Sequence, residues 1–237
     1  MNTGPILALE RITFAYPERP ALFRELDFSL REGEHVGLHG PNGSGKTTLL
    51  RLIMGLETPQ GGRILHRGEP VDNGAALHRL RCGVGLVMQN SDDQLFSATV
   101  LEDVAFGPLN LGLKRREARD RAMETLERME LAELADRATH RLSVGEKKMA
   151  SIASVLSMRP RALLLDEPTA SLDDDARNRI IAILRKETIA RIIVSHDKDF
   201  LGRTASSFVR IAGSGVIEAA LPAFPAAGGC HGESPSA

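Results

Sequence analysis

One glycine-rich loop constrains this chain more than any other part of its sequence. The loop follows the apolar run His35–Leu38, precedes a helix-like segment Thr48–Met54, and consists of Gly40, Pro41, Asn42, Gly43, Ser44, Gly45, Lys46 and Thr47. A strand, a Gly-rich turn and a helix in this order direct backbone N–H groups and the positive end of a helix at one point. That point attracts an anion, so the sequence predicts a phosphate-binding loop in an α/β fold.

The side chains at the end of this loop suit a nucleoside triphosphate. The ammonium group of Lys46 reaches β- and γ-phosphates, and the hydroxyl of Thr47 is a ligand for Mg2+. We therefore expect every residue of the loop, and Thr48 after it, to contact ATP bound together with Mg2+.

A second polar element follows an apolar run in the second half of the chain. Leu163–Leu165 is typical of a buried strand, and Asp166 and Glu167 come directly after it. Ligands of open α/β sheets bind at the carboxyl ends of the strands. We expect Asp166 to hold Mg2+, directly or through water, and Glu167 to act on the water that attacks the γ-phosphate.

The spacing of these two elements indicates an insertion. Lys46 and Asp166 are 120 positions apart, farther than in small GTPases and nucleoside kinases. Between them, about residues 92–159 are mostly helical in pattern. Arg115–Asp136 has apolar residues three or four apart, as an amphipathic helix does, and Ser143–Met158 is a second helical segment. The sequence predicts a P-loop core with an inserted helical lobe.

The rest of the chain completes an α/β pattern. An N-terminal antiparallel β lobe is expected from strands at Ile6–Phe14 and Leu22–Leu30. After Glu167 we expect a helix at Asp174–Lys186, a strand at Arg191–Ser195, and a closing hairpin of Val209–Ala212 and Gly215–Ala219. The predicted domain covers residues 1–221, and residues 222–237, rich in Pro, Gly, Ala and Ser, are expected to form a disordered tail.

Composition excludes several classes of protein. A net charge of −1, one Tyr and no Trp give no support for a nucleic-acid partner. Cys82 and Cys230 form no CxxC pair, so neither a disulfide framework nor a zinc site is predicted, and Cys230-His231 in the tail is too little for a metal site. The N-terminus does not resemble a signal peptide, and no apolar run approaches the ~18 residues that span a bilayer.

Further short motifs lie in an order that resembles the ABC ATPase family. The run Leu142–Glu146 is similar to the family's signature, usually LSGGQ or LSGGE. Gln89 is similar to the Q-loop glutamine, Asp173 to the D-loop aspartate, and His196 to the switch histidine. Tyr16 stands where the family places an aromatic residue against adenine.

The resemblance covers about residues 5–220 and implies roles for single residues. The catalytic residues that it implies are Lys46, Gln89, Glu167 and His196. The Mg2+ ligands that it implies are Thr47, Gln89 and Asp166. Further nucleotide contacts are implied for Tyr16, Ser143, Gly145, Glu146 and Asp173.

The signature also has a physical meaning of its own. Ser143 followed by Glu146 three residues later predicts a capping box at a helix start, and a capped helix N-terminus favours an anion. In ABC ATPases that anion is the γ-phosphate bound by the other subunit of a head-to-tail dimer. The resemblance therefore implies a second ATPase subunit as a partner.

A narrower resemblance is to the ATPases of energy-coupling-factor importers, especially the cobalt/nickel type. It rests on Asp92–Phe96, Asp103–Pro108 and Glu146–Lys148. It implies that a transmembrane coupling subunit docks on Asp92, Asp93, Leu95 and Phe96, and that a substrate-binding membrane subunit acts indirectly. The implied place is the cytoplasmic face of the inner membrane. The implied cargo is nickel or cobalt, with a vitamin such as biotin as the alternative.

Two residues depart from the family pattern. Val144 stands where the signature has Gly, and Met149 stands where the coupling-factor group usually has Arg. A β-branched side chain at Val144 puts the turnover rate in doubt rather than the fold. Two other classes of protein are alternatives. A soluble ABC ATPase that acts on DNA or ribosomes usually has long coiled-coil insertions or two fused cassettes, and this chain has neither. A small-molecule P-loop kinase would lack Gln89, the Ser143 signature and His196.

Overall fold

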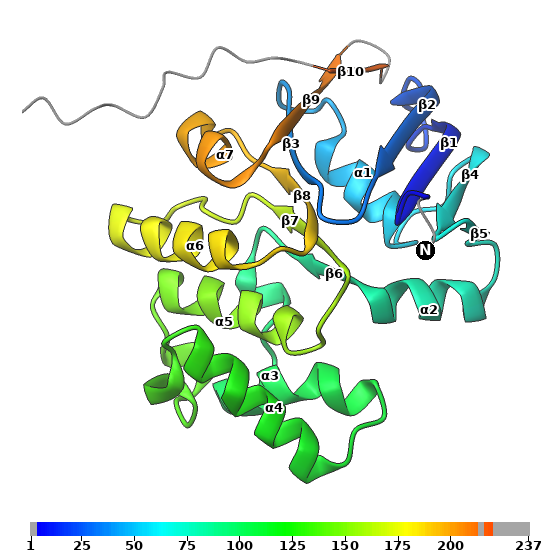
Figure 1. Ribbon diagram of the computed structural model, residues 1–237. Helices are drawn as coiled ribbons and strands as arrows, with labels where there is room; N and C mark the ends of the chain where they lie inside the picture. The colour runs from blue at the N-terminus through cyan, green and yellow to red at the C-terminus, as the bar shows by residue number, and fades with distance from the viewer. Residues whose placement is uncertain (1–3, 213–215, 220–237) are drawn as a thin grey trace, which may run out of the picture.

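A six-stranded sheet, parallel except for one edge strand, lies at the centre of the protein (Figure 1). The computed structural model describes residues 4–212 and 216–219. The strand order is β10-β9-β3-β8-β7-β6, and only β10 pairs antiparallel to its neighbour. The strands are β3 (His35–His39), β6 (Val84–Val87), β7 (Ala162–Asp166), β8 (Ala190–Val194), β9 (Ser207–Ala212) and β10 (Val216–Ala219).

Both faces of this sheet are buried, because alternate residues of a strand point to opposite sides. In β7, Leu163 and Leu165 belong to one apolar core, while Ala162 and Leu164 belong to the other. All five residues of β7 and of β8 are buried. This explains why the sequence shows these strands as continuous apolar runs instead of alternating ones.

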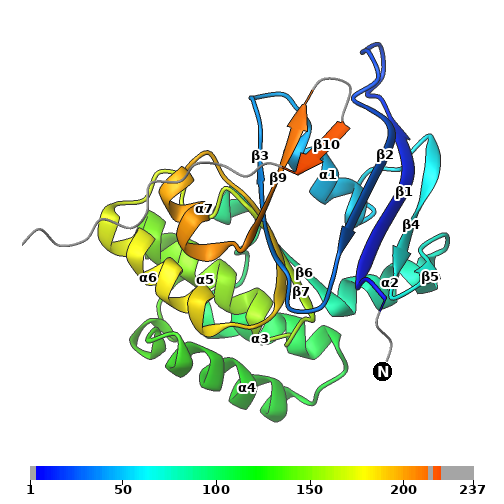
Figure 2. The ribbon, with the colours of Figure 1, turned by 45° about the horizontal axis from the view of Figure 1, so that its top comes forward.

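An antiparallel sheet and the helix α1 (Lys46–Ile53) cover one face. The sheet order is β2-β1-β4-β5, and the strands are β1 (Leu7–Phe14), β2 (Phe23–Leu30), β4 (Gly61–His66) and β5 (Glu69–Pro70). Helix α1 lies between the two sheets in both ribbon views (Figures 1 and 2). The predicted antiparallel β lobe is thus confirmed, with β4 and β5 as additional strands.

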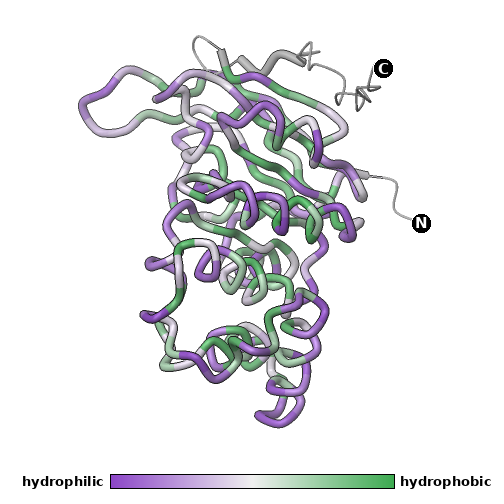
Figure 3. Tube along the Cα trace, turned by 90° about the vertical axis from the view of Figure 1, so that its left-hand side faces the viewer, coloured by the Kyte–Doolittle hydropathy of each residue, from purple (hydrophilic) through white to green (hydrophobic). Residues whose placement is uncertain are grey.

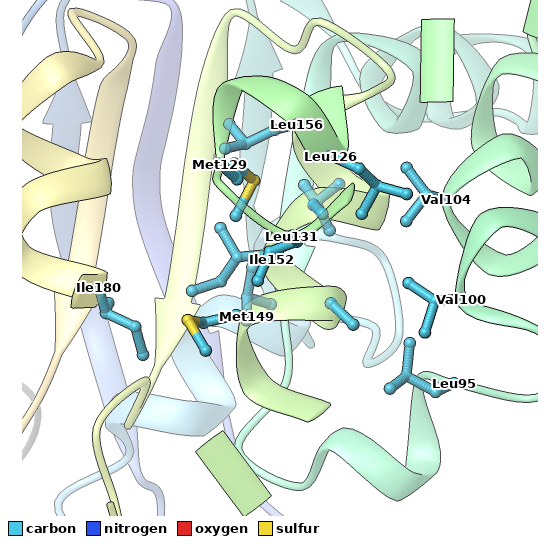
Figure 4. Packing of buried hydrophobic residues seen from close by; sticks show 14 of the residues in the cluster. Leu95, Val100, Val104, Leu126, Met129, Leu131, Met149, Ile152, Leu156 and Ile180 are labelled. Atoms are coloured by element: carbon cyan, nitrogen blue, oxygen red, sulfur yellow. The ribbon is translucent and has the colours of Figure 1, made fainter. Parts of the chain in front are cut away.

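Helices cover the other face of the parallel sheet and extend beyond it. They include α3 (Val100–Asn110), α4 (Arg115–Arg128), α5 (Val144–Leu156) and α6 (Asp174–Lys186), while α2 (Gly74–Gly83) precedes β6 and α7 (Lys198–Thr204) follows β8. Apolar side chains of α3, α4 and α5 meet in one core (Figure 4). Figure 3 shows hydrophobic residues concentrated on the central strands and hydrophilic ones on the outer turns.

The structure corrects two sequence-based expectations in this helical region. The helix expected over Arg115–Asp136 ends at Arg128, because Glu130 adopts a left-handed conformation with φ of 58°. The N–H of Leu131 then bonds the carbonyl of Leu126 at 2.8 Å, which closes the helix end. Leu95, expected on a docking surface, is 9% exposed and packs in the core of the helical region.

The last third of the described chain agrees with the elements predicted there. Helix α6 has the predicted bounds, and β9 pairs with β10 as the predicted hairpin. The turn at residues 213–215 and the tail at 222–237 lie outside the described residues. The domain limits at 1–221 and the limits of the helical lobe stay predictions. Within the part of the chain that is described, no helix is both long enough and apolar enough to cross a bilayer.

Close packing between β6 and α5 gives a test of the fold. A Cβ added at Gly85 would lie 2.1 Å from Cγ1 of Val155, whose β-branched side chain has little freedom to turn in a helix. We expect Gly85→Ala to lower the free energy of unfolding by about 1–3 kcal/mol in urea titrations. Gly74→Ala, where a Cβ meets open space, is the control and should leave stability unchanged or slightly raised.

Candidate functional site

Four parallel strands end at one edge of the central sheet, and each is followed by a predicted site residue. The glycine-rich loop follows β3, Gln89 follows β6, Asp166 and Glu167 end β7, and His196 follows β8. A cavity of about 860 Å3 opens at this edge. The predicted residues that line it are Tyr16, Asn42, Gly43, Gly45, Lys46, Thr47, Thr48, Gln89, Asp166, Glu167 and His196. The fold thus brings together residues 180 positions apart in the sequence.

The loop needs glycine at two positions for steric reasons. Gly45 has φ of 97°, and a Cβ there would lie 2.7 Å from Cζ of Phe23. Gly40 has φ of 154°, and its Cβ would lie 2.9 Å from the carbonyl oxygen of Ile211. Because both residues are confined by neighbours from β2 and β9, the loop can curl tightly only without side chains there.

Lys46 is held inside this loop. Its side chain is buried, and its ammonium donates to the carbonyl oxygens of Gly40 at 2.9 Å and Pro41 at 3.0 Å. Burial lowers the pKa of Lys46, an effect that the carboxylates of Glu167 and Asp166 oppose. The loop therefore fixes a positive charge at the start of α1, beside the helix N-terminus.

Asp166 faces the same helix from the end of β7. The hydroxyl of Thr47 donates to Oδ1 of Asp166 at 3.2 Å, and Asp166 is 6% exposed. Burial raises the pKa of Asp166, while the Thr47 hydrogen bond and the cations Lys148, Lys46 and Arg51 oppose the rise. A carboxylate and a hydroxyl oxygen in contact fit Mg2+, which prefers hard oxygen ligands.

Glu167 differs from Asp166 in being paired with a histidine. Its Oε1 lies 3.5 Å from Nε2 of His196, and its Oε2 accepts from the backbone N–H of His196 at 3.4 Å. Glu167 has φ of 45°, a strained value for a non-glycine residue. Burial raises the pKa of Glu167, and Oε1 has no hydrogen-bond partner among the described residues. A half-buried carboxylate with one oxygen that makes no hydrogen bond is suited to accept a proton.

Tyr16 and Gln89, two more predicted residues, also line the cavity. The hydroxyl of Tyr16 lies 3.1 Å from Oγ1 of Thr48, and its ring packs edge-on against Phe14 with centroids 4.9 Å apart. The side chain of Gln89 is exposed and has no hydrogen-bond partner among the residues that are described. Its backbone carbonyl, by contrast, accepts from Lys148 at 2.6 Å.

Seven predicted nucleotide-contacting residues do not line the cavity. They are Gly40, Pro41, Ser44, Ser143, Gly145, Glu146 and Asp173. The first three belong to the loop itself, and the hydroxyl of Ser44 is buried without a partner among the described residues. The other four lie at the starts of α5 and α6, so one chain does not bring them to the ATP-side cavity.

The capping box predicted at the signature is confirmed. The N–H of Glu146 donates to Oγ of Ser143 at 3.2 Å, and the N–H of Ser143 donates to Oε2 of Glu146 at 2.8 Å. Asp173 caps α6 by accepting from the N–H of Ala176 at 2.8 Å. Gly145 lies close to this second helix start, because a Cβ there would be 2.8 Å from Cβ of Ala176.

Sequence reasoning missed several residues that line the cavity. Arg19 and Pro20 belong to the same loop as Tyr16, and Thr169, Ala170 and Asp197 follow or precede predicted site residues. Arg19 had a usable signal, since a cation three positions after Tyr16 can reach the same ligand. The others carry no motif of their own.

Comparisons with known proteins identify the family of this chain. Residues 23–170 match the model of the ABC transporter family. The cobalt import ATP-binding protein CbiO of Rhodobacter capsulatus is 43% identical over 205 residues, which are 85% of this chain and 73% of that protein. The energy-coupling factor transporter ATP-binding protein EcfA of Methanothermobacter thermautotrophicus is 42% identical over 204 residues, 84% of this chain and 66% of that protein.

Solved structures give the same result. CbiO1 of Clostridium perfringens, described as part of the ABC transporter complex cbiONQ, superposes with a TM-score of 0.79 at 34% identity. The superposition covers 90% of this chain and 87% of CbiO1. The chain is similar to the ATPase subunits of cobalt and energy-coupling-factor importers. The family match and these relatives show that it belongs to the ABC transporter ATPase family.

Proposed function

We propose that this chain is the ATP-hydrolysing subunit that energises an importer of the energy-coupling-factor type. It would act at the cytoplasmic face of the inner membrane, as one half of a head-to-tail ATPase dimer docked on membrane subunits. The observation that carries the proposal is the convergence of Lys46, Thr47, Asp166 and Glu167 on one cavity at the carboxyl edge of the sheet. ATPase activity and transport measured with the membrane subunits test it.

The residues of the cavity divide the work of phosphoryl transfer to water. Lys46 and the loop N–H groups bind the phosphates, and Thr47, Asp166 and Gln89 would hold Mg2+, which neutralises charge on the phosphate oxygens. Glu167 orients the attacking water and accepts its proton at Oε1. His196 keeps that carboxylate in place by its contacts to both oxygens. Tyr16 offers its ring face or edge to the base.

A second subunit completes the site in this proposal. The start of α5, with its capping box of Ser143 and Glu146, presents N–H groups and the positive end of a helix dipole. It does not line the cavity of its own chain, so these donors serve a nucleotide held by another copy or by a related subunit. Gly145 lets the starts of α5 and α6 lie close together on this surface, and Asp173 caps α6.

An exposed aromatic pair supports docking on a membrane subunit. Phe96 is 66% exposed and Phe106 is 43% exposed, and their ring centroids lie 4.8 Å apart. Leu109, on the same helix as Phe106, is 39% exposed. Asp93 lies nearby on the chain and makes no ion pair among the described residues, while Asp92 pairs with Lys147 at 2.6 Å. An apolar patch beside a free carboxylate suits a helix with an apolar face and one cation.

Nickel or cobalt is the cargo that we propose. The support is the name of the relative from Rhodobacter capsulatus, which is a cobalt import protein. A vitamin such as biotin is the alternative cargo, since a separate membrane subunit would recognise the substrate. Uptake assays with nickel, cobalt and biotin in cells that express the whole complex decide between them.

The first prediction separates the role of Glu167 from that of Lys46. Glu167→Gln removes the proton acceptor but keeps the phosphate contacts, so ATP·Mg2+ binding should stay near normal while kcat falls about a hundredfold or more. Lys46→Ala should instead weaken ATP binding itself, because the lost contact exists before the transition state. Titration calorimetry and steady-state kinetics measure both. Near-normal turnover of Glu167→Gln would remove Glu167 from the proposed role.

The second prediction concerns the departure at Val144. This residue is the first of α5 and is 59% exposed, so its side chain lies on the surface proposed to meet the partner's nucleotide. Val144→Gly should raise the ATPase rate or ATP-driven dimerisation by about threefold or more. Stability should change little, because Val144 packs against little. Identical rates and dimerisation in both proteins would show that valine is fully tolerated.

The third prediction tests the docking surface. Phe96→Ser combined with Asp93→Asn should leave ATP binding and the melting temperature of the isolated chain unchanged, but should abolish co-purification with the membrane subunits. Leu56→Ser, an exposed leucine elsewhere that is 51% exposed, is the matched control and should assemble normally. Wild-type assembly and uptake by the double variant would exclude this surface.

A further inference from the structure

A buried lysine links the signature helix to the loop that contains Gln89. Lys148 lies in the second turn of α5 and is 2% exposed. Its ammonium donates to the carbonyl oxygen of Met88 at 2.8 Å and to that of Gln89 at 2.6 Å. Burial of a cation costs free energy unless the cation is hydrogen-bonded, so these two contacts stabilise Lys148 in its buried position.

A second side chain ties the same segment to α5. Oε1 of Gln94 accepts from the N–H of Met88 at 3.1 Å, and its Nε2 donates to the carbonyl of Ser151 at 3.0 Å and to Oγ of Ser154 at 3.2 Å. The N–H and the carbonyl of Met88 are thus both held by groups attached to α5. The end of β6 therefore has a fixed backbone, although the side chain of Gln89 is free.

Lys148 also interacts with Asp166, another predicted Mg2+ ligand. Of the cations that oppose the rise in the pKa of Asp166, Lys148 has the largest effect. Burial lowers the pKa of Lys148 itself to about 8, and Asp166 opposes that shift. The ammonium group that holds the carbonyl of Gln89 therefore also interacts electrostatically with Asp166.

We propose that Lys148 is a positioning residue that, together with Gln94, fixes the backbone of Met88 and Gln89 to α5, so that the side chain of Gln89 keeps one place beside Mg2+·ATP. The proposal rests on the proposed function of the cavity. Through Lys148, the helix whose start carries Ser143, which would meet the partner's nucleotide, is rigidly connected to the segment that contains Gln89. A shift of α5 would move Gln89 with it.

The test compares Lys148→Met, which keeps the size of the side chain but removes its donors and charge, with Lys148→Arg, which keeps both. The full chain is used, with ATP and Mg2+ as the probes. In Lys148→Met, amide hydrogens of residues 89–94 should exchange about tenfold faster, while those of α1 stay protected. The Mg2+ concentration for half-maximal hydrolysis should rise about fivefold and kcat should fall about tenfold, with Mg2+-free ATP affinity unchanged within about twofold.

Lys148→Arg should return the Mg2+ dependence toward that of the wild type. Lys186→Met, the same change at an exposed lysine of α6, is the control and should alter nothing. Wild-type exchange at residues 89–94 together with wild-type Mg2+ dependence in Lys148→Met would overturn the proposal. A wild-type chain that binds no ATP would instead overturn the proposed function. The two failures can be told apart, because amide exchange is measured without turnover and does not depend on ATP binding.

If Lys148→Met loses protection throughout α1, it has unfolded, and Gln94→Met takes its place. This variant removes the uncharged tie between the same segment and α5. It should accelerate exchange at residues 88–94 and raise the half-maximal Mg2+ concentration about threefold. Unchanged values of both in a folded Gln94→Met chain would equally overturn the proposal.

Discussion

The hydrogen bond from Thr47 to Asp166 joins the two halves of the candidate site. It connects the helix that follows β3 to the end of β7, although the two residues are 119 positions apart. The contact exists because parallel strands present their carboxyl ends at one edge of the sheet. Gln89 and His196 reach the same edge from β6 and β8, so the site depends on the register of four strands rather than on any single loop.

Charge at this edge is buried and balanced. Two lysines, Lys46 and Lys148, have lowered pKa values, and two carboxyls, Asp166 and Glu167, have raised ones, in each case chiefly because of burial. Both lysines offset part of the desolvation of Asp166, and Lys46 does the same for Glu167, whereas Asp166 raises the pKa of Glu167 further. A ligand that enters this edge therefore meets charges of both signs: Lys46 suits phosphate oxygens and Asp166 suits Mg2+.

Local patterns in the sequence predicted much of this arrangement. Contacts between residues far apart in the chain had no such pattern and were not predicted. The glycine-rich loop, the capping box at Ser143 and the apolar run before Asp166 have recognisable chemistry over a few residues. The end of α4 was missed because Glu130, not a glycine, takes the left-handed conformation. The buried contacts of Lys148 have no signal in the sequence, because a lysine within a helix is ordinarily solvated. Its partners are carbonyl groups 59 and 60 positions earlier, which no local pattern reveals.

In the proposed function, one chain supplies only part of the catalytic site, because the signature at the start of α5 does not line the cavity of its own chain. The most direct test is the ATPase rate per chain, measured against chain concentration alone and with the membrane subunits. The account predicts a rate that rises steeply with concentration or on assembly, in step with dimer formation seen by light scattering. A constant rate from a chain that stays monomeric throughout would contradict it.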